Sequence, residues 1–361
     1  YVTDQEPQEF TFEYQGSGTS VEEYAFTFED EQTTVELSKA DLTDKKELPG
    51  ASLKVTDEDG NTVDEWVSKE EAHIIKGLIV GKKYKMTETK PADGYVTAES
   101  IEFTVENTKE VQKHQMLDDV TKVEISKKDI TDSSEVPGAK MIILDKDGKK
   151  VESWTSTDKP HMVEKLPVGE YTLREEQAPD GYLIAEDVKF TVKDTGKVQK
   201  VKMKDAHPYG KLVIKKTDST SKAALPGAEF ELREKESGEV VEKLVTDKTG
   251  TATSGKIPIA TYKNGKVEKT VEYILVETKA PNGYELSSKK EEIRFEYKDG
   301  KTKVIEIVKE IKNTKSPSGS TPTGNSPKTG DSTNIWLPIL LAVLSACGIG
   351  GVIWYKKKKG N

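Results

Sequence analysis

The sequence has a single cysteine, Cys347, which lies in an apolar run near the C-terminus. No disulfide can therefore brace any domain of this chain. The four histidines are scattered, and the sequence contains no metal-ligand spacing, no phosphate-binding loop and no nucleophile elbow. We therefore expect no metal, no cofactor and no enzymatic turnover.

Excess positive charge is also lacking. The 55 Lys and Arg residues are outnumbered by 64 Asp and Glu residues, which gives a net charge of −9. Because nucleic acids are bound mainly by basic surfaces, we expect no nucleic-acid partner. With a third of its residues charged, the chain instead fits an exported, water-facing protein.

One pattern occurs three times, with three reactive residue types in the same order. A Lys near the end of an alternating segment comes first, as in VELSKAD, a Glu follows, as in YKMTETKPADGY, and an Asp or Asn closes the unit. The three sets are Lys39, Glu88 and Asp118; Lys127, Glu175 and Asp205; and Lys216, Glu277 and Asn313.

These side chains are predicted to face the protein core. Residues two apart in a strand share a face, so Val35 and Leu37 place Lys39 on their apolar side. The same count places Glu88 with Met86, and it holds for the other members of the three sets. A buried lysine tends to lose its proton and a buried carboxyl tends to keep its proton.

This pairing predicts a specific reaction. A neutral amine is a nucleophile, and a protonated Glu can polarise the carbonyl of Asp or Asn and then move protons. The product is a Lys–Asp or Lys–Asn isopeptide bond. The alternative is that the lysines are solvated and the glutamates are ordinary surface acids, as most are. Three sets in identical order favour the reaction.

The units resemble the Cna protein B-type domain, also called the prealbumin-like or pilin isopeptide domain. The resemblance rests on the Lys-x-Asp segments, on the Y-x-L-x-E-x-x-AP-x-GY pattern, and on an L-x-GA element at residues 48–51, 136–139 and 225–228. It implies small inverse Ig-like β-sandwiches, each with a self-formed Lys–Asp or Lys–Asn bond between the first and last strands, assisted by the Glu. The first unit departs from the pattern by inverting Ala-Pro to Pro91-Ala92.

Residues 250–270 make the third unit longer than the others. They predict an extended loop or an added hairpin, with a turn at Asn264 and Gly265. The segments Asp57–Asn61 and Asp145–Lys149 resemble calcium loops, but the distal Glu is not in place, and hairpin turns explain both.

The predicted architecture is all-β. Tandem small β-sandwich domains arranged in a rod occupy residues 34–121, 122–209 and 210–314. Residues 1–33 match the end of a unit, since QEFTFE resembles IEFTVE and Asp30 precedes Lys39 by the interval that separates Asp118 from Lys127. We therefore interpret them as the remnant of a preceding domain, with Asp30 as an orphan acceptor, in a piece of a longer protein.

The C-terminal region predicts covalent anchoring. A Ser/Thr/Pro/Gly linker at 315–325 and a motif at 326–330 precede an apolar run at 335–355, which is long enough to be a transmembrane helix, and a basic tail at 356–361. The motif consists of Ser326, Pro327, Lys328, Thr329 and Gly330. This order resembles the LPxTG sorting signal of Gram-positive surface proteins, with Ser326 in place of Leu. The resemblance implies that a sortase cleaves after Thr329 and joins it to peptidoglycan. A plain single-pass membrane anchor is the alternative.

Three functions are consistent with these features. The first is the structural stalk of a cell-wall-anchored adhesin, which holds an upstream ligand-binding region away from a Gram-positive cell. The second is a sortase-assembled pilin subunit, although the segment Thr261–Gly265 lacks the Pro of a YPKN-like pilin motif. In the third, the repeats themselves bind host matrix protein. We favour the stalk because similar repeats suit spacing better than specific recognition.

Overall fold

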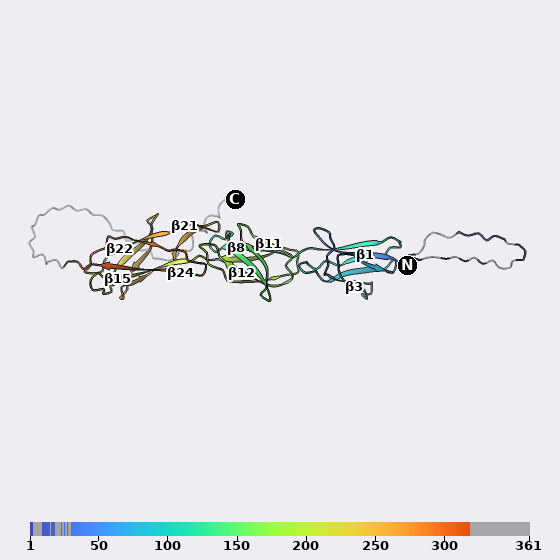
Figure 1. The fold of residues 1–361 in the computed structure, drawn as a ribbon, viewed down its shortest axis with the longest axis horizontal. Helices are drawn as coiled ribbons and strands as arrows, with labels where there is room; N and C mark the ends of the chain where they lie inside the picture. The colour runs from blue at the N-terminus through green and yellow to red at the C-terminus, as the bar shows by residue number, and fades with distance from the viewer. Residues whose placement is uncertain are drawn as a thin grey trace, which may run out of the picture. The chain divides into compact units, whose positions relative to one another are not determined.

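The computed structural model describes residues 1–2, 9–14, 16–18, 23, 25, 27 and 30–317. All helix or strand structure in these residues is β-strand, and the all-β prediction is confirmed. The strands form three successive domains, coloured blue, green, and yellow to orange in Figure 1. We call them domain 1 (β1–β7), domain 2 (β8–β14) and domain 3 (β15–β24).

Domain 1 is a sandwich of two sheets. The three-stranded sheet has the order β4-β1-β7 and contains β1 (Thr34–Asp41), β4 (His73–Lys76) and β7 (Gln112–Asp118). The four-stranded sheet has the order β3-β2-β5-β6 and contains β2 (Ser52–Thr56), β3 (Thr62–Val67), β5 (Lys83–Lys90) and β6 (Ile101–Thr104). Alternate residues of both sheets, such as Leu37 and Met86, form the core between them.

Domain 2 repeats this arrangement. Its three-stranded sheet has the order β11-β8-β14 and contains β8 (Lys122–Asp129), β11 (His161–Glu164) and β14 (Gln199–Asp205). Its four-stranded sheet has the order β10-β9-β12-β13 and contains β9 (Lys140–Asp145), β10 (Lys150–Thr155), β12 (Gly169–Gln177) and β13 (Val188–Val192). The predicted hairpin turns are present between β2 and β3 and between β9 and β10. At both, an Asp accepts backbone N–H bonds, and Gly60 or Gly148 adopts a positive φ.

Domain 3 contains the predicted insertion. Its first sheet contains β15 (Tyr209–Asp218), β18 (Thr251–Thr253), β19 (Ile257–Pro258) and β24 (Val304–Asn313), and its second contains β16 (Glu229–Glu234), β17 (Val240–Val245), β22 (Glu272–Lys279) and β23 (Glu291–Arg294). The inserted residues form a hairpin of β20 (Ala260–Lys263) and β21 (Lys266–Thr270). Its turn lies at Asn264 and Gly265, as predicted, and both residues have positive φ. Strand β15 begins at Tyr209, one residue before the predicted domain boundary.

The first and last strands of each domain are parallel neighbours. Strand β1 pairs with β7, β8 with β14, and β15 with β24. A parallel pair needs a long connection, and here the rest of the domain is that connection. This topology brings together residues from the two ends of each repeat.

Candidate cross-linking sites

The lysine and the acceptor of each set lie on these two neighbouring strands. Asp41 is the register partner of Asp118, so Lys39 lies two positions before the acceptor and on the same face. The Nζ atom of Lys39 contacts Oδ1 of Asp118, Lys127 contacts Asp205 in the same way, and Lys216 contacts Oδ1 of Asn313. The structure therefore brings together all three predicted pairs.

All three lysines are buried, as the alternation predicted. The exposed fraction of the residue is 1% for Lys39, 3% for Lys127 and 0% for Lys216. The Lys216 Nζ atom also lies 5.7 Å from the centroid of the Phe230 ring in the core of domain 3. A lysine is rarely buried without a partner, so these amines depend on the carboxyl and amide groups beside them.

The glutamate reaches each pair from the opposite sheet. Glu88 lies on β5, Glu175 on β12 and Glu277 on β22, one central strand of each four-stranded sheet. A carboxylate oxygen lies 2.9 Å from Nζ of Lys39, 3.0 Å from that of Lys127 and 3.1 Å from that of Lys216. Each site thus connects the two layers of its sandwich.

A backbone hydrogen bond orients each glutamate, which the sequence did not reveal. Oε2 of Glu88 accepts the N–H of Ala98 at 2.6 Å, Oε2 of Glu175 that of Ala185 at 2.7 Å, and Oε2 of Glu277 that of Ser287 at 2.8 Å. In every domain the donor follows the glutamate by ten residues. The ten-residue spacing between the glutamate and its N–H donor repeats in the sequence. The hydrogen bond itself depends on how the loop after the glutamate's strand folds.

Burial favours the neutral form of three groups in these sites, Asp118, Asp205 and Lys216. It raises the pKa of Asp118 and that of Asp205 to about 7, although the neighbouring lysine opposes this rise. Burial also lowers the pKa of Lys216, with Glu277 opposing that change. A neutral carboxylic acid is a better acceptor for a nucleophile than a carboxylate, and a neutral amine is the nucleophile.

The acceptor of domain 3 has a different hydrogen-bond pattern. Nδ2 of Asn313 donates to both oxygens of Glu277, at 3.0 and 3.1 Å. The nitrogen that would depart as ammonia therefore already faces the carboxyl that can protonate it. In domains 1 and 2 the corresponding Oδ2 atoms of Asp118 and Asp205 are buried without a hydrogen-bond partner.

A second pair, which sequence analysis missed, lies at the end of each first strand, where its Asp is buried. The Tyr95 hydroxyl donates to Asp41 at 2.7 Å, the Tyr182 hydroxyl to Asp129 at 2.7 Å and the Tyr284 hydroxyl to Asp218 at 2.8 Å. The Tyr95 hydrogen bond holds the pKa of Asp41 well below its usual range. We call these contacts the Asp–Tyr pairs. Their signals in the sequence were the Asp that ends each Lys-x-Asp segment and the Tyr that follows an Asp-Gly or Asn-Gly dipeptide in each unit.

Other predicted sites are not assembled in the described residues. Asp30 is exposed, and the nearest bridge joins Val2 to Glu31. The sorting motif 326–330 and the apolar run 335–355 lie outside the described residues. Within those residues, no helix is long and apolar enough to cross a membrane, and no group of three His, Cys, Asp or Glu residues could hold a metal ion.

Comparison with known families identifies these domains. The model of the SpaA prealbumin-like fold domain matches residues 33–119, 121–207 and 210–311, which is most of the chain. The chain belongs to this family. It consists of SpaA-type prealbumin-like domains in tandem, and the resemblance drawn from the sequence is confirmed.

The chain is also similar to several solved structures. The Bacillus anthracis TIE protein is 27% identical, with a TM-score of 0.53 over 79% of this chain and 52% of its own. This chain therefore spans about half the length of that relative. BcpA, the major pilin subunit of Bacillus cereus, is 18% identical, with a TM-score of 0.47 over 79% of this chain and 100% of its own. The full-length major pilin SpaD from Corynebacterium diphtheriae is 18% identical, with a TM-score of 0.37 over 81% of this chain and 99% of its own. No curated protein matches the chain.

Proposed function

We propose that the chain is the structural stalk of a cell-wall-anchored surface protein, and that a self-formed isopeptide bond closes each SpaA-type domain. The observation that carries the proposal is the buried contact of a lysine amine with an Asp or Asn acceptor, repeated in all three domains beside a glutamate. Such bonds would replace the disulfides that the sequence cannot form.

The reaction follows from the contacts. In domains 1 and 2 the Nζ atom of the lysine attacks Cγ of the aspartic acid, an Nζ–Cγ bond forms, and a Cγ–O bond breaks to release water. In domain 3 the Cγ–Nδ2 bond of Asn313 breaks and ammonia leaves. The glutamate takes a proton from the attacking amine and delivers one to the leaving group. Each glutamate acts once in its own domain, so the protein is not an enzyme with turnover.

Anchoring completes the proposal. The motif at 326–330, the apolar run at 335–355 and the basic tail at 356–361 support a membrane precursor that sortase joins to peptidoglycan at Thr329, on the surface of a Gram-positive cell. A host ligand would then be bound by a region upstream of this chain. Assembly into a pilus is the alternative, and it would appear as sortase-linked multimers of the protein.

Intact mass spectrometry of residues 1–316, which form one compact unit, tests the cross-links. The mass should fall short of the sequence mass by two waters and one ammonia. A variant with Lys39→Ala, Lys127→Ala and Lys216→Ala should have its full calculated mass and serves as the control. An unmodified mass in the unsubstituted protein after prolonged folding would refute the reaction.

Digestion of the cell wall tests the anchor separately. The released protein should end at Thr329 and lack Cys347 and the tail. A Thr329→Ala variant should remain in the membrane fraction. Recovery of the tail on the wall-released protein would contradict sorting and leave a plain membrane anchor, without affecting the evidence for the cross-links.

A further inference from the structure

The same loop of the fold contacts the preceding domain at both joints. It is the segment that leads from the sheet with the first and last strands of a domain into a central strand of the other sheet. In domain 2 it comprises residues 165–168, between β11 and β12. In domain 3 it comprises residues 254–271, between β18 and β22, and carries the β20–β21 hairpin.

At the first joint this loop inserts a lysine into an Asp–Tyr pair. The Lys165 Nζ atom of domain 2 donates to the Tyr95 hydroxyl at 2.6 Å and to Oδ2 of Asp41 at 3.2 Å, both in domain 1. It lies 4.8 Å from the centroid of the Tyr95 ring. The contact includes the backbone, because a Cβ atom on Gly94 would lie 2.4 Å from the carbonyl oxygen of Lys165. Gly94 also has a positive φ of 85°, so both conditions favour glycine there.

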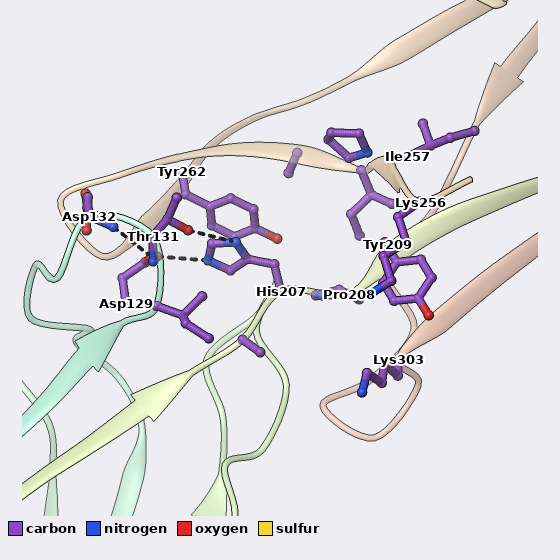
Figure 2. A pocket seen from close by; sticks show the side chains of 15 residues that line it. Asp129, Thr131, Asp132, His207, Pro208, Tyr209, Lys256, Ile257, Tyr262 and Lys303 are labelled. Carbon is purple, nitrogen blue, oxygen red and sulfur yellow. Dashed lines mark hydrogen bonds and ion pairs between the residues drawn. The ribbon is translucent and has the colours of Figure 1, made fainter. Parts of the chain in front are cut away.

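At the second joint the hairpin contacts the corresponding pair through aromatic rings. The Tyr262 ring of β20 stacks on the His207 ring, with centroids 3.5 Å apart and planes within 3°. His207 in turn pairs with Asp129 at 2.9 Å, and Tyr262 meets the edge of Tyr182. The Tyr262 hydroxyl donates to the carbonyl of Gly181 at 2.8 Å. Figure 2 shows Tyr262 and His207 face to face beside Asp129, at one side of a hollow of about 530 Å³.

Further contacts extend this second joint. A Cβ atom on Gly265 would lie 1.9 Å from the carbonyl oxygen of Glu135, so the hairpin turn lies against the backbone of domain 2. The Tyr297 hydroxyl donates to the carbonyl of Tyr182 at 3.0 Å. The N–H of Ile184 donates to the carbonyl of Gly300 at 2.8 Å. Domain 3 therefore contacts domain 2 through the hairpin and also through the segment between β23 and β24.

We propose that this loop is a docking element, and that the Asp–Tyr pair of the preceding domain is its receptor, so that each joint is held in one orientation. The receptor is the same at the two joints, but the docking groups differ: an ammonium group at the first and a stacked tyrosine at the second. The equivalent loop of domain 1 has Gly77 where domain 2 has Lys165. The inference concerns the joints and holds whether or not the isopeptide bonds form.

Distance measurements between spin labels test each joint in the full chain. Nitroxides are placed on cysteines at the exposed positions 59 and 147 for the first joint, and 147 and 248 for the second, with Cys347 replaced by Ser. Lys165→Ala should broaden the distance distribution across the first joint only. Tyr262→Ala should broaden that across the second joint only. The matched controls, Lys159→Ala and Lys263→Ala, change exposed lysines of the same two domains and should leave both distributions unchanged.

Amide exchange in β22 shows whether domain 3 remains folded in the Tyr262→Ala variant. If amide exchange in β22 rises, Tyr262→Ala has destabilised domain 3, and the test uses the milder Tyr262→Phe variant instead. This variant retains the stacked ring and loses only the hydrogen bond to Gly181. This variant should broaden the second distribution by a smaller amount. Unchanged distributions in both Lys165→Ala and the folded Tyr262 variant would overturn the proposal, as would broadening of both joints by either substitution.

Discussion

Lys39 and Asp118 lie 79 residues apart in the sequence, and their side chains meet in a buried site between two adjacent parallel strands. The equivalent separations are 78 residues in domain 2 and 97 in domain 3. A covalent bond at such a site closes nearly the whole domain into a loop. If the chain-entropy model for disulfides applies, each bond stabilises its domain by about 4 to 5 kcal/mol.

The proton shuttle of each domain should act only within that domain. Replacing Glu88 with Ala should abolish the bond of domain 1 and leave the other two intact, because Glu175 and Glu277 each pair with the lysine of their own domain. The intact mass should then rise by one water beyond the change expected from the substitution. Glu102→Ala, on the exposed face of β6, is the control. Loss of all three bonds from the single Glu88 change would contradict independent domains.

Bond formation should depend on pH differently in the three domains. Below about pH 7 Asp118 and Asp205 are neutral acids, because burial raises the pKa of each to about 7, and above it they become carboxylates that resist attack. Asn313 does not titrate. As pH rises through about 7, bond formation after refolding should therefore slow in domains 1 and 2 relative to domain 3. A time course of intact mass at several pH values measures this.

The control for the pH experiment exchanges the acceptor. Asp118→Asn should give domain 1 the pH profile of domain 3 and should change the lost molecule from water to ammonia. If the three domains keep one common pH profile before and after this exchange, the protonation state of the acceptor does not govern the reaction.

The Asp–Tyr pair should contribute to stability apart from the cross-link. Tyr284→Phe removes the hydrogen bond to Asp218, a residue only 2% exposed, and leaves one carboxylate oxygen without that donor. A hydrogen bond to a charged group is stabilising, so the free energy of unfolding of domain 3 should fall. Thermal denaturation measures the change, with Tyr14→Phe at an exposed position as the control. Equal stability of the two variants would show that the pair contributes little.

Much of the fold and of the cross-linking site could be predicted from the sequence, because both depend on strand alternation. Counting by two from Val35 places Lys39 on the core side, and the same count works for Met86 and Glu88. Because the order Lys, Glu, then Asp or Asn occurs three times, the repeat also indicated which residues belong to one site. These inferences need only the direction in which a side chain leaves its strand.

The remaining contacts depend on how loops fold in three dimensions. Tyr95 meets Asp41 from 54 residues away, and it lies in an isolated bridge with Val120 outside the named strands, so alternation does not place it. Lys165 and Tyr262 contact the preceding domain from segments that connect the two sheets of their own domains. The sequence predicted the hairpin that carries Tyr262, but nothing in its local pattern indicates what the hairpin contacts.

The position of each proposed bond predicts the mechanical response of the protein. Tension enters domain 2 at the start of β8 and leaves at the end of β14, and Lys127 and Asp205 lie on these two strands. With the bond in place, the load passes directly from Lys127 to Asp205 and bypasses the residues between them. Separating the terminal strands would require breaking an amide. Force spectroscopy should therefore show no domain-length extension step in the unsubstituted protein.

Lys127→Ala should restore one step, and only one, because it releases only domain 2. The freed segment of 78 residues would add about 260–280 Å of contour length at roughly 3.3–3.6 Å per residue. Lys140→Ala changes an exposed lysine of the same domain and should restore no step. Full-length steps in the unsubstituted protein would show that the bonds are absent, and the stalk would then have only non-covalent sandwiches to resist tension.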